Sequence, residues 1–309
     1  MNDSREAMYW SAAENRNVRC GLCPHRCNIT ENAAGICGVR KNQGGVMIAS
    51  GYGQISSVAL DPIEKKPLYM FHPGKSILSI GGFGCNLRCP FCQNHEISMQ
   101  VPNFGATPAM PTEGAHVTGS RTAGSRTAYA RAPGEIAALA VQTMPDGNIG
   151  VAYTYNEPLI DYEFIYDCAK QVRDAGLKNV LVTNGYINKE PLKNLLPMID
   201  AMNIDLKGFS DSFYKKLGGK VEPVKETIAL SQKHCHVEVT TLVIPGENED
   251  DIEEIAKWLS KIDQEIPLHL SRFFPRHRYT NKAPTPRDTI YKLQKTANGY
   301  LKHVFTGNM

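Results

Sequence analysis

Three cysteines lie close together just after an apolar run, residues 77–80, that predicts a strand: Cys85, Cys89 and Cys92. Their spacing, C-x3-C-x2-C, lets one short loop hold three corners of an iron–sulfur cluster. A cubane has four irons, and thiolates normally bind all of them. Three ligands therefore leave one iron without a protein ligand, and an open position on a metal can hold a substrate. The loop predicts a [4Fe–4S] cluster with one accessible iron.

Two other roles for these cysteines are a zinc knuckle and a disulfide framework. Of the Cys and His residues that follow, only His95 has the spacing of a fourth zinc ligand. Structural disulfides belong to oxidising compartments, and the polar residues 1–6 lack the apolar run of a secretory signal. The spacing therefore favours an iron–sulfur cluster.

A second group of four cysteines stands near the amino terminus, with the spacing C-x2-C-x3-C-x9-C: Cys20, Cys23, Cys27 and Cys37. Four thiolates complete a tetrahedral zinc site or an auxiliary [4Fe–4S] cluster equally well. Such a closed site is structural or relays electrons. We favour the auxiliary cluster, although spacing alone leaves both metals open. His25 is a spare ligand and is expected to be a surface loop residue.

The composition is that of an ordinary globular chain of 309 residues, 42% hydrophobic and 21% charged. This length allows one large α/β domain with a small appendage. No apolar run approaches the length needed to cross a bilayer, so we expect a cytoplasmic protein without a membrane partner. A net charge of +3 is too weak to indicate nucleic-acid binding. Seven of the nine cysteines fall in two tight groups, which in a reducing compartment indicates metal sites.

From residue 75 onward, short apolar runs alternate with amphipathic segments of helical length. Six strands alternating with helices predict an α/β fold with a parallel sheet, and polar strand ends favour a partial (β/α)6 barrel with its site at the C-terminal rim. The predicted strands are Ser76–Gly82, Ile149–Tyr155, Asn179–Thr183, Ala201–Lys207, Val237–Ile244 and Leu268–Phe274. The predicted helices are Gly134–Met144, Pro158–Ala175, Lys189–Met198, Glu222–Lys233, Asp250–Ile262 and one from Arg287 onward.

Composition also divides the chain. Residues 1–74, rich in Cys, Gly and Pro, are predicted to form a metal-binding module and connector, and residues 75–309 the core domain. Residues 102–131 are poor in aliphatic side chains and contain a tandem repeat of Gly-Ser-Arg-Thr-Ala, so a flexible insertion is predicted there. Lys65 and Lys66, between module and core, are expected to face solvent, with contact to a substrate as the alternative.

Polar side chains follow successive predicted strands. Glu157 comes after the second strand, Thr183 and Asn184 end the third, and alternation places Asp205 and Lys207 on one face of the fourth. Taken singly, they have plain explanations, such as a structural ion pair between Asp205 and Lys207 or a tight turn after Thr183. Together, above an open cluster, they predict a site for a ligand with amino-acid, ribose and adenine parts.

From residue 75 to residue 277, these motifs resemble the radical S-adenosylmethionine (radical SAM) superfamily, and within it the glycyl-radical-activating branch typified by pyruvate formate-lyase activating enzyme. The resemblance implies that Cys85, Cys89 and Cys92 hold a [4Fe–4S] cluster whose fourth iron binds SAM. The further SAM-contacting residues that it implies are Phe91 beside adenine, Asn156 and Glu157 at the amino group, Thr183 and Asn184, Asp205 and Lys207 near the methionyl end, and His277.

Three positions depart from that branch: Tyr155-Asn156 replaces a glycine pair, Val182 an acid and Thr240 an arginine. These departures speak against a pyruvate formate-lyase partner. Nearly the whole chain resembles the radical SAM component of the AmmeMemoRadiSam system. The motifs that carry this second resemblance are Cys20-x2-Cys23-Pro24-His25-x-Cys27 and the segments 61–68, 154–158 and 203–208.

The resemblance implies an enzyme that reductively cleaves SAM at the cluster to a 5′-deoxyadenosyl radical, which abstracts hydrogen from a substrate. The expected substrate is a partner protein, and the expected reductant is a low-potential donor of the flavodoxin or ferredoxin type. Two alternatives stay open. The substrate could be a small molecule or nucleoside, or the protein could be a non-catalytic iron–sulfur or zinc scaffold.

Overall fold

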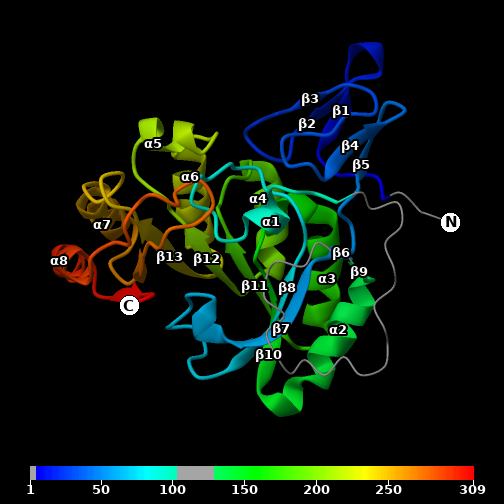
Figure 1. Ribbon diagram of the computed structural model, residues 1–309. Coiled ribbons are helices and arrows are strands. Elements are labelled where there is room, and N and C mark those ends of the chain that lie inside the picture. Colours follow the sequence, from blue (N-terminus) through cyan, green and yellow to red (C-terminus); the bar gives the residue numbers. More distant parts are fainter. Residues whose placement is uncertain (1–4, 103–128) are drawn as a thin grey trace.

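The computed structural model describes residues 5–102 and 129–309, and its centre is an eight-stranded sheet (Figure 1). The strand order is β15-β14-β13-β12-β11-β10-β8-β7. Every neighbouring pair is parallel except the last, because the edge strand β7 (Ser57–Pro62) runs antiparallel to β8 (Ser76–Gly81). The remaining strands are β10 (Asn148–Tyr153), β11 (Lys178–Thr183), β12 (Ala201–Asp205), β13 (His236–Val243), β14 (Leu268–Arg272) and β15 (Val304–Gly307).

Helices form the crossovers that parallel neighbours require. Helix α2 packs beside α3, and both contact strand β10. Most residues of β8, β10, β11, β12 and β13 are buried, and the buried ones are mainly aliphatic apart from polar residues such as Asn179 and Glu238, which fits a sheet covered by helices. The helices are α1 (His95–Ser98), α2 (Pro133–Gln142), α3 (Tyr162–Asp174), α4 (Lys189–Leu195), α5 (Asp211–Lys216), α6 (Glu222–Ser231), α7 (Asp251–Ile262) and α8 (Arg287–Ala297).

The α/β class and the predominantly parallel sheet confirm the predicted fold. Several strands end earlier than predicted, because the polar residues at the rim do not take part in the hydrogen bonding of the sheet. Strand β12 ends at Asp205 and β10 ends at Tyr153. Strands β7 and β15 and helices α1 and α5 were not predicted. Apart from β7, they are only a single turn or a few residues long, so hydrophobic periodicity carries little signal there. Most of the segment 102–131, predicted to be a flexible insertion, lies outside the described residues.

The amino-terminal segment contains small antiparallel sheets. Strands β1 (Trp10–Ala12), β2 (Val18–Cys20) and β3 (Asn28–Ile29) form one, β4 (Arg40–Gln43) and β5 (Val46–Ala49) another, and β6 (Gln54–Ile55) pairs with β9 (Tyr129–Ala130). A buried ion pair ties this segment to helix α3, with Arg40 Nη1 2.9 Å from Glu163 Oε1. Leu22 and Met47 belong to the same apolar core as the large sheet. The division at residue 74 stays a prediction.

The segment between β7 and β8 lies across the lower end of the large sheet, where β8 begins, while the loop that carries α1 follows the upper end of β8 (Figure 1). Asn203 Nδ2 donates to the carbonyl oxygen of Pro67 at 2.8 Å. The fully buried Glu238 accepts hydrogen bonds from the backbone N–H groups of Tyr69 and Met70, at 3.0 and 2.8 Å. Glu238 thereby fixes this segment to strand β13.

Glu238 is held as a carboxylate. Burial alone would raise its pKa, but hydrogen bonds from His236, His269 and the Met70 N–H outweigh burial and lower the pKa to about 2. We expect Glu238→Gln to reduce the free energy of unfolding by about 3 kcal/mol at neutral pH, since each pKa unit is worth about 1.4 kcal/mol. Urea titrations of both proteins would measure this difference.

The sign of the pH dependence follows from the lowered pKa. The stabilisation by Glu238 is fully present above the pKa of the unfolded state and is lost as the pH falls through that value toward about 2. The difference between wild type and Glu238→Gln should therefore shrink in acid. Glu226→Gln, at an exposed position, is the control and should match wild type. A difference that stays constant down to acidic pH would contradict the assignment.

Within residues 5–102 and 129–309, no helix is both long and apolar enough to span a membrane.

Seven strands of the large sheet run parallel to one another, so their carboxyl ends meet at one rim.

Candidate active site

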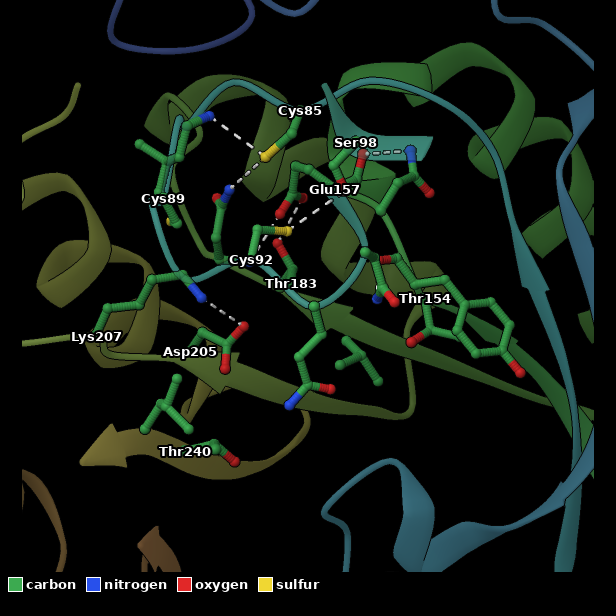
Figure 2. Close-up of a pocket in the computed structure, with 18 of the residues that line it drawn as sticks. Cys85, Cys89, Cys92, Ser98, Thr154, Glu157, Thr183, Asp205, Lys207 and Thr240 are labelled. Atoms are coloured by element: carbon green, nitrogen blue, oxygen red, sulfur yellow. Dashed lines mark hydrogen bonds and ion pairs between the residues drawn. The ribbon is translucent and has the colours of Figure 1, made fainter. Parts of the chain in front are cut away.

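A cavity of about 420 Å³ opens at the carboxyl ends of the strands (Figure 2). Cys85, Cys89 and Cys92 border it on one side, and Asp205, Lys207 and Thr240 lie across from them. Almost every residue predicted to hold the cluster or the ligand is found in its wall. These wall residues are Cys85, Cys89, Phe91, Cys92, Asn156, Glu157, Thr183, Asn184, Asp205 and Lys207.

The cysteine loop begins directly after β8, and its turn depends on Gly84. This glycine has φ +83°, and a Cβ there would overlap the carbonyl oxygen of Cys37. The Leu87 N–H donates to Cys85 Sγ at 3.3 Å, and Cys92 Sγ lies 3.9 Å from Ser98 Oγ. These contacts aim the thiols at the cavity and leave them with weak partners only.

The burial of the three thiols suits them to bind iron. Burial raises the pKa of Cys89 to about 12, partly offset by Lys207, and it raises the pKa of Cys85 and Cys92 as well. Such thiols lose their protons when a metal ion binds, because the cation supplies the charge that the surroundings lack. Within the described residues, no other cysteine borders this cavity. The donor set therefore fits three corners of a cluster.

Glu157 links the ends of β10 and β11. Its Oε1 accepts from Thr183 Oγ1 at 2.7 Å and from the Leu159 N–H at 3.0 Å, while Oε2 accepts from the Asn184 N–H at 2.7 Å. Burial raises the pKa of Glu157 to about 7, although these three bonds oppose the rise. A carboxylate can accept about four hydrogen bonds, so one acceptor position remains for a ligand cation.

Two amides tie the strand-end loops to the cysteine loop. Asn156 Oδ1 accepts from the Gly82 N–H at 2.9 Å, and its Nδ2 donates to the Phe83 carbonyl at 3.1 Å. Asn184 Nδ2 donates to Asn86 Oδ1 at 2.9 Å and lies 3.6 Å from Cys85 Sγ. Because their polar atoms are engaged in this way, both side chains position the loop that carries the thiols.

Asp205 and Lys207 form an ion pair in the wall, with Nζ 3.0 Å from Asp205 Oδ2. Burial lowers the pKa of Lys207, but Asp205 and Cys89 outweigh burial and raise it above its usual range. The backbone N–H of Lys207 also donates to the Tyr214 hydroxyl at 3.1 Å. The ion pair therefore stabilises the wall, and both of its residues border the cavity.

His277 is the predicted ligand residue that the structure does not bring to the cavity wall. Its ring stacks on His95, with centroids 4.5 Å apart, and its backbone has φ +51°. Burial lowers the pKa of His277, and the neighbouring His95 adds to this effect. Its Nε2 is buried without a hydrogen-bond partner among the described residues. Contact between His277 and SAM stays a prediction.

Sequence reasoning missed part of the wall. Lys66 was expected to face solvent; instead it lines the cavity and is only 3% exposed. Tyr155 and Thr240, two of the positions that depart from the family pattern, also border the cavity. In the sequence, the only sign of this role for Lys66 is a pair of adjacent lysines just after a strand. Hydrophobic periodicity cannot distinguish such a pair from two lysines in a solvent-exposed turn.

The four amino-terminal cysteines border a second, small cavity of about 10 Å³, together with His25, Arg40 and Asn86. His25 is half-buried rather than on an open surface, and its Nε2 lies 2.6 Å from the Asn86 carbonyl oxygen. Arg88 donates to the carbonyls of both Ile36 and Cys85. The two cysteine groups are therefore neighbours in space. Over the described residues, no set of three Cys, His, Asp or Glu side chains is placed to hold a single metal ion.

Residues 79–259 match the radical SAM superfamily. An uncharacterized protein of Methanocaldococcus jannaschii is 40% identical over 311 residues, covering 99% of this chain and 85% of that protein. The pyruvate formate-lyase 1-activating enzyme of Escherichia coli is 28% identical over 106 residues, which are 33% of this chain and 43% of the enzyme.

Among solved structures, Streptococcus suis SuiB bound to S-adenosylmethionine is similar in fold, with a TM-score of 0.52 at 13% identity. The similarity covers 72% of this chain and 48% of SuiB. The superfamily match spans more than half of the chain and includes the cysteine loop and the ends of β10 to β13. The chain therefore belongs to the radical SAM superfamily of enzymes, whose members use a [4Fe–4S] cluster and SAM.

Proposed function

We propose that this protein cleaves SAM reductively and abstracts a hydrogen atom from a partner protein, as a glycyl-radical activating enzyme does. The observation that carries the proposal is one cavity bordered by three buried thiols and, opposite them, by Asp205 and Lys207. When bound, the cluster supplies one electron to the sulfonium of SAM, which yields methionine and a radical able to remove hydrogen.

The chain's own residues hold and orient the reactants. Cys85, Cys89 and Cys92 are the cluster ligands, and Glu157 accepts a hydrogen bond from the SAM ammonium group. Lys207 donates to the SAM carboxylate, and Asp205 keeps Lys207 charged and in place. Phe91, buried in the wall, provides an apolar face for adenine.

A protein substrate is supported by the similarity to the pyruvate formate-lyase 1-activating enzyme, whose name states that it acts on another enzyme. The electron donor in this proposal is a flavodoxin or ferredoxin, because SAM cleavage requires a low-potential electron. A small-molecule substrate is the competing possibility, and the assay below separates the two.

We also propose that residues 1–74 carry a second [4Fe–4S] cluster on Cys20, Cys23, Cys27 and Cys37. The four thiols border one small cavity, and what supports a cluster over zinc is that Cys37 lies against Gly84, next to the first cluster ligand. A second cluster so close to the first could pass electrons to it, which a zinc ion, having no redox chemistry, could not do.

The test is anaerobic reconstitution followed by metal analysis and SAM turnover. We expect about eight irons per chain, four for each cluster, and formation of 5′-deoxyadenosine with a low-potential reductant. The double variant Cys20→Ser/Cys23→Ser should lose about four irons and keep the rest. One zinc with about four irons would overturn the second cluster, and no SAM cleavage by a fully loaded protein would overturn the enzyme proposal.

The substrate is tested in the same reaction. Candidate glycyl-radical enzymes are added, and a protein-based radical is sought by electron paramagnetic resonance. A radical on the added protein supports the activating function. Turnover that responds to small acids or nucleosides, with no protein radical, would favour the small-molecule alternative.

A further inference from the structure

One acid and two lysines form a cluster at the cavity, where β7 ends and the next segment begins. Asp61 is the last residue but one of β7, and about one helical turn later come Lys65 and Lys66, both of which border the cavity. Lys66 Nζ lies 2.8 Å from Asp61 Oδ2, and Lys65 Nζ lies 3.1 Å from Asp61 Oδ1. Neither lysine has a role in the radical chemistry described above.

Tyr155, in the loop that follows β10, completes this cluster. Its hydroxyl donates to Asp61 Oδ2 at 2.8 Å, and Lys66 Nζ lies 4.7 Å from the centre of its ring, in reach of a cation–π contact. Tyr155 has φ +70°, a conformation that is costly for a residue with a side chain. A Cβ at Gly81 would lie 2.9 Å from the Tyr155 ring, so glycine there makes room for this orientation.

The cluster carries an excess of positive charge. Hydrogen bonds from Lys66, Tyr155 and Lys65 outweigh the effect of burial and lower the pKa of Asp61 to about 2, so this acid is ionised. One carboxylate then faces two ammonium groups. Each ammonium has three N–H donors and uses one on Asp61, so donors remain on both lysines.

Among the described residues, the acids that line the cavity already have partners of their own. Asp205 is paired with Lys207, and Glu157 is engaged by three hydrogen bonds at the ends of β10 and β11. Lys66, 3% exposed, is held by Asp61, so its contribution to ligand binding comes from the N–H donors that Asp61 does not use.

The cluster reaches the cavity from the end of the barrel opposite the cysteine loop. The segment that carries it leads into the start of β8 and is anchored below the cavity by Asn203 and Glu238, whereas the cysteine loop follows the end of β8. An anionic group held there would lie in the same cavity as the cluster ligands.

We propose that Lys65 and Lys66 form a binding site for an anionic group of the substrate, a carboxylate or a phosphate. The inference rests on the proposed function, because it assigns the site to the substrate of that reaction. For a protein substrate, the group is an acidic side chain or a terminal carboxylate beside the residue that loses hydrogen.

The test is calorimetric titration of the reconstituted, SAM-loaded protein with two probes, inorganic phosphate and glutarate. We expect wild type to bind one probe with a Kd on the order of millimolar, and the probe that binds identifies the anion class. Lys66→Met should weaken binding by about tenfold, the loss of about 1.4 kcal/mol, while Lys66→Arg keeps the charge and most of the affinity. Lys257→Met, on the outer face of α7, should bind as wild type does.

Asp61→Asn provides a readout that a merely structural role would not give. Removing the carboxylate raises the positive charge of the cluster, so anion affinity should increase several-fold even if the protein becomes less stable. If Lys66→Met does not fold, Lys65→Ala takes its place, because this side chain is 60% exposed and its loss should still weaken binding.

Absence of binding by wild type to both probes, or unchanged affinity in the lysine variants, would overturn the site. The proposed function is tested separately, by SAM cleavage in the absence of probe. Wild-type protein that cleaves SAM but binds neither probe would refute the anion site alone, while loaded protein that cannot cleave SAM would refute the proposed function.

Discussion

Cys89→Ala should abolish formation of 5′-deoxyadenosine, with a loss of at least about a thousandfold. Three thiols border the cavity in the part of the chain that the structure describes, so removing one leaves two anchors for a cluster that needs three. The iron content should fall by about four per chain. Chromatography of the reaction products and metal analysis of the same sample measure both effects.

Cys235→Ala is the matched control for this variant. Cys235 is also a partly buried thiol with a raised pKa, but it contacts the Ser231 carbonyl and does not border the cavity. It should retain wild-type iron content and SAM cleavage. Circular dichroism shows whether both variants fold. Substantial SAM cleavage by folded Cys89→Ala would refute the ligand assignment.

Glu157→Gln should weaken SAM binding by about a hundredfold, close to 3 kcal/mol. The neutral amide cannot pair with the ammonium group of SAM, which removes a charge-assisted hydrogen bond. The side-chain NH2 group of the glutamine must also face a hydrogen-bond donor, because Thr183 Oγ1 donates to one carboxylate oxygen of Glu157 and the Asn184 N–H donates to the other. Equilibrium dialysis of reconstituted protein with labelled SAM measures the affinity.

The control for Glu157→Gln is Glu135→Gln on helix α2. Glu135 also accepts a backbone N–H, that of Ala132 at 2.7 Å, but it does not border the cavity. This variant should keep wild-type SAM affinity. If Glu157→Gln unfolds more easily yet binds SAM as wild type does, Glu157 only joins the strand ends and does not contact SAM.

The sequence predicted most of the large sheet because its strands are buried on both faces and read as short apolar runs. It predicted little of the amino-terminal segment, where strands of two to four residues, such as β3 and β4, leave no measurable period. Strand β4 is tied to α3 by the ion pair between Arg40 and Glu163, a contact between residues far apart in the chain.

By itself, the sequence determined the cysteine loop and the polar strand ends. The spacing of ligands within one loop, and the position of Asp205 and Lys207 two residues apart at the end of one strand, are local properties of the chain. Only the tertiary structure decided that Lys66 enters the cavity, that Tyr155 meets Asp61 across 94 positions of sequence, and that His277 stacks on His95. Those placements depend on how the curved sheet brings distant segments together, which no local pattern encodes.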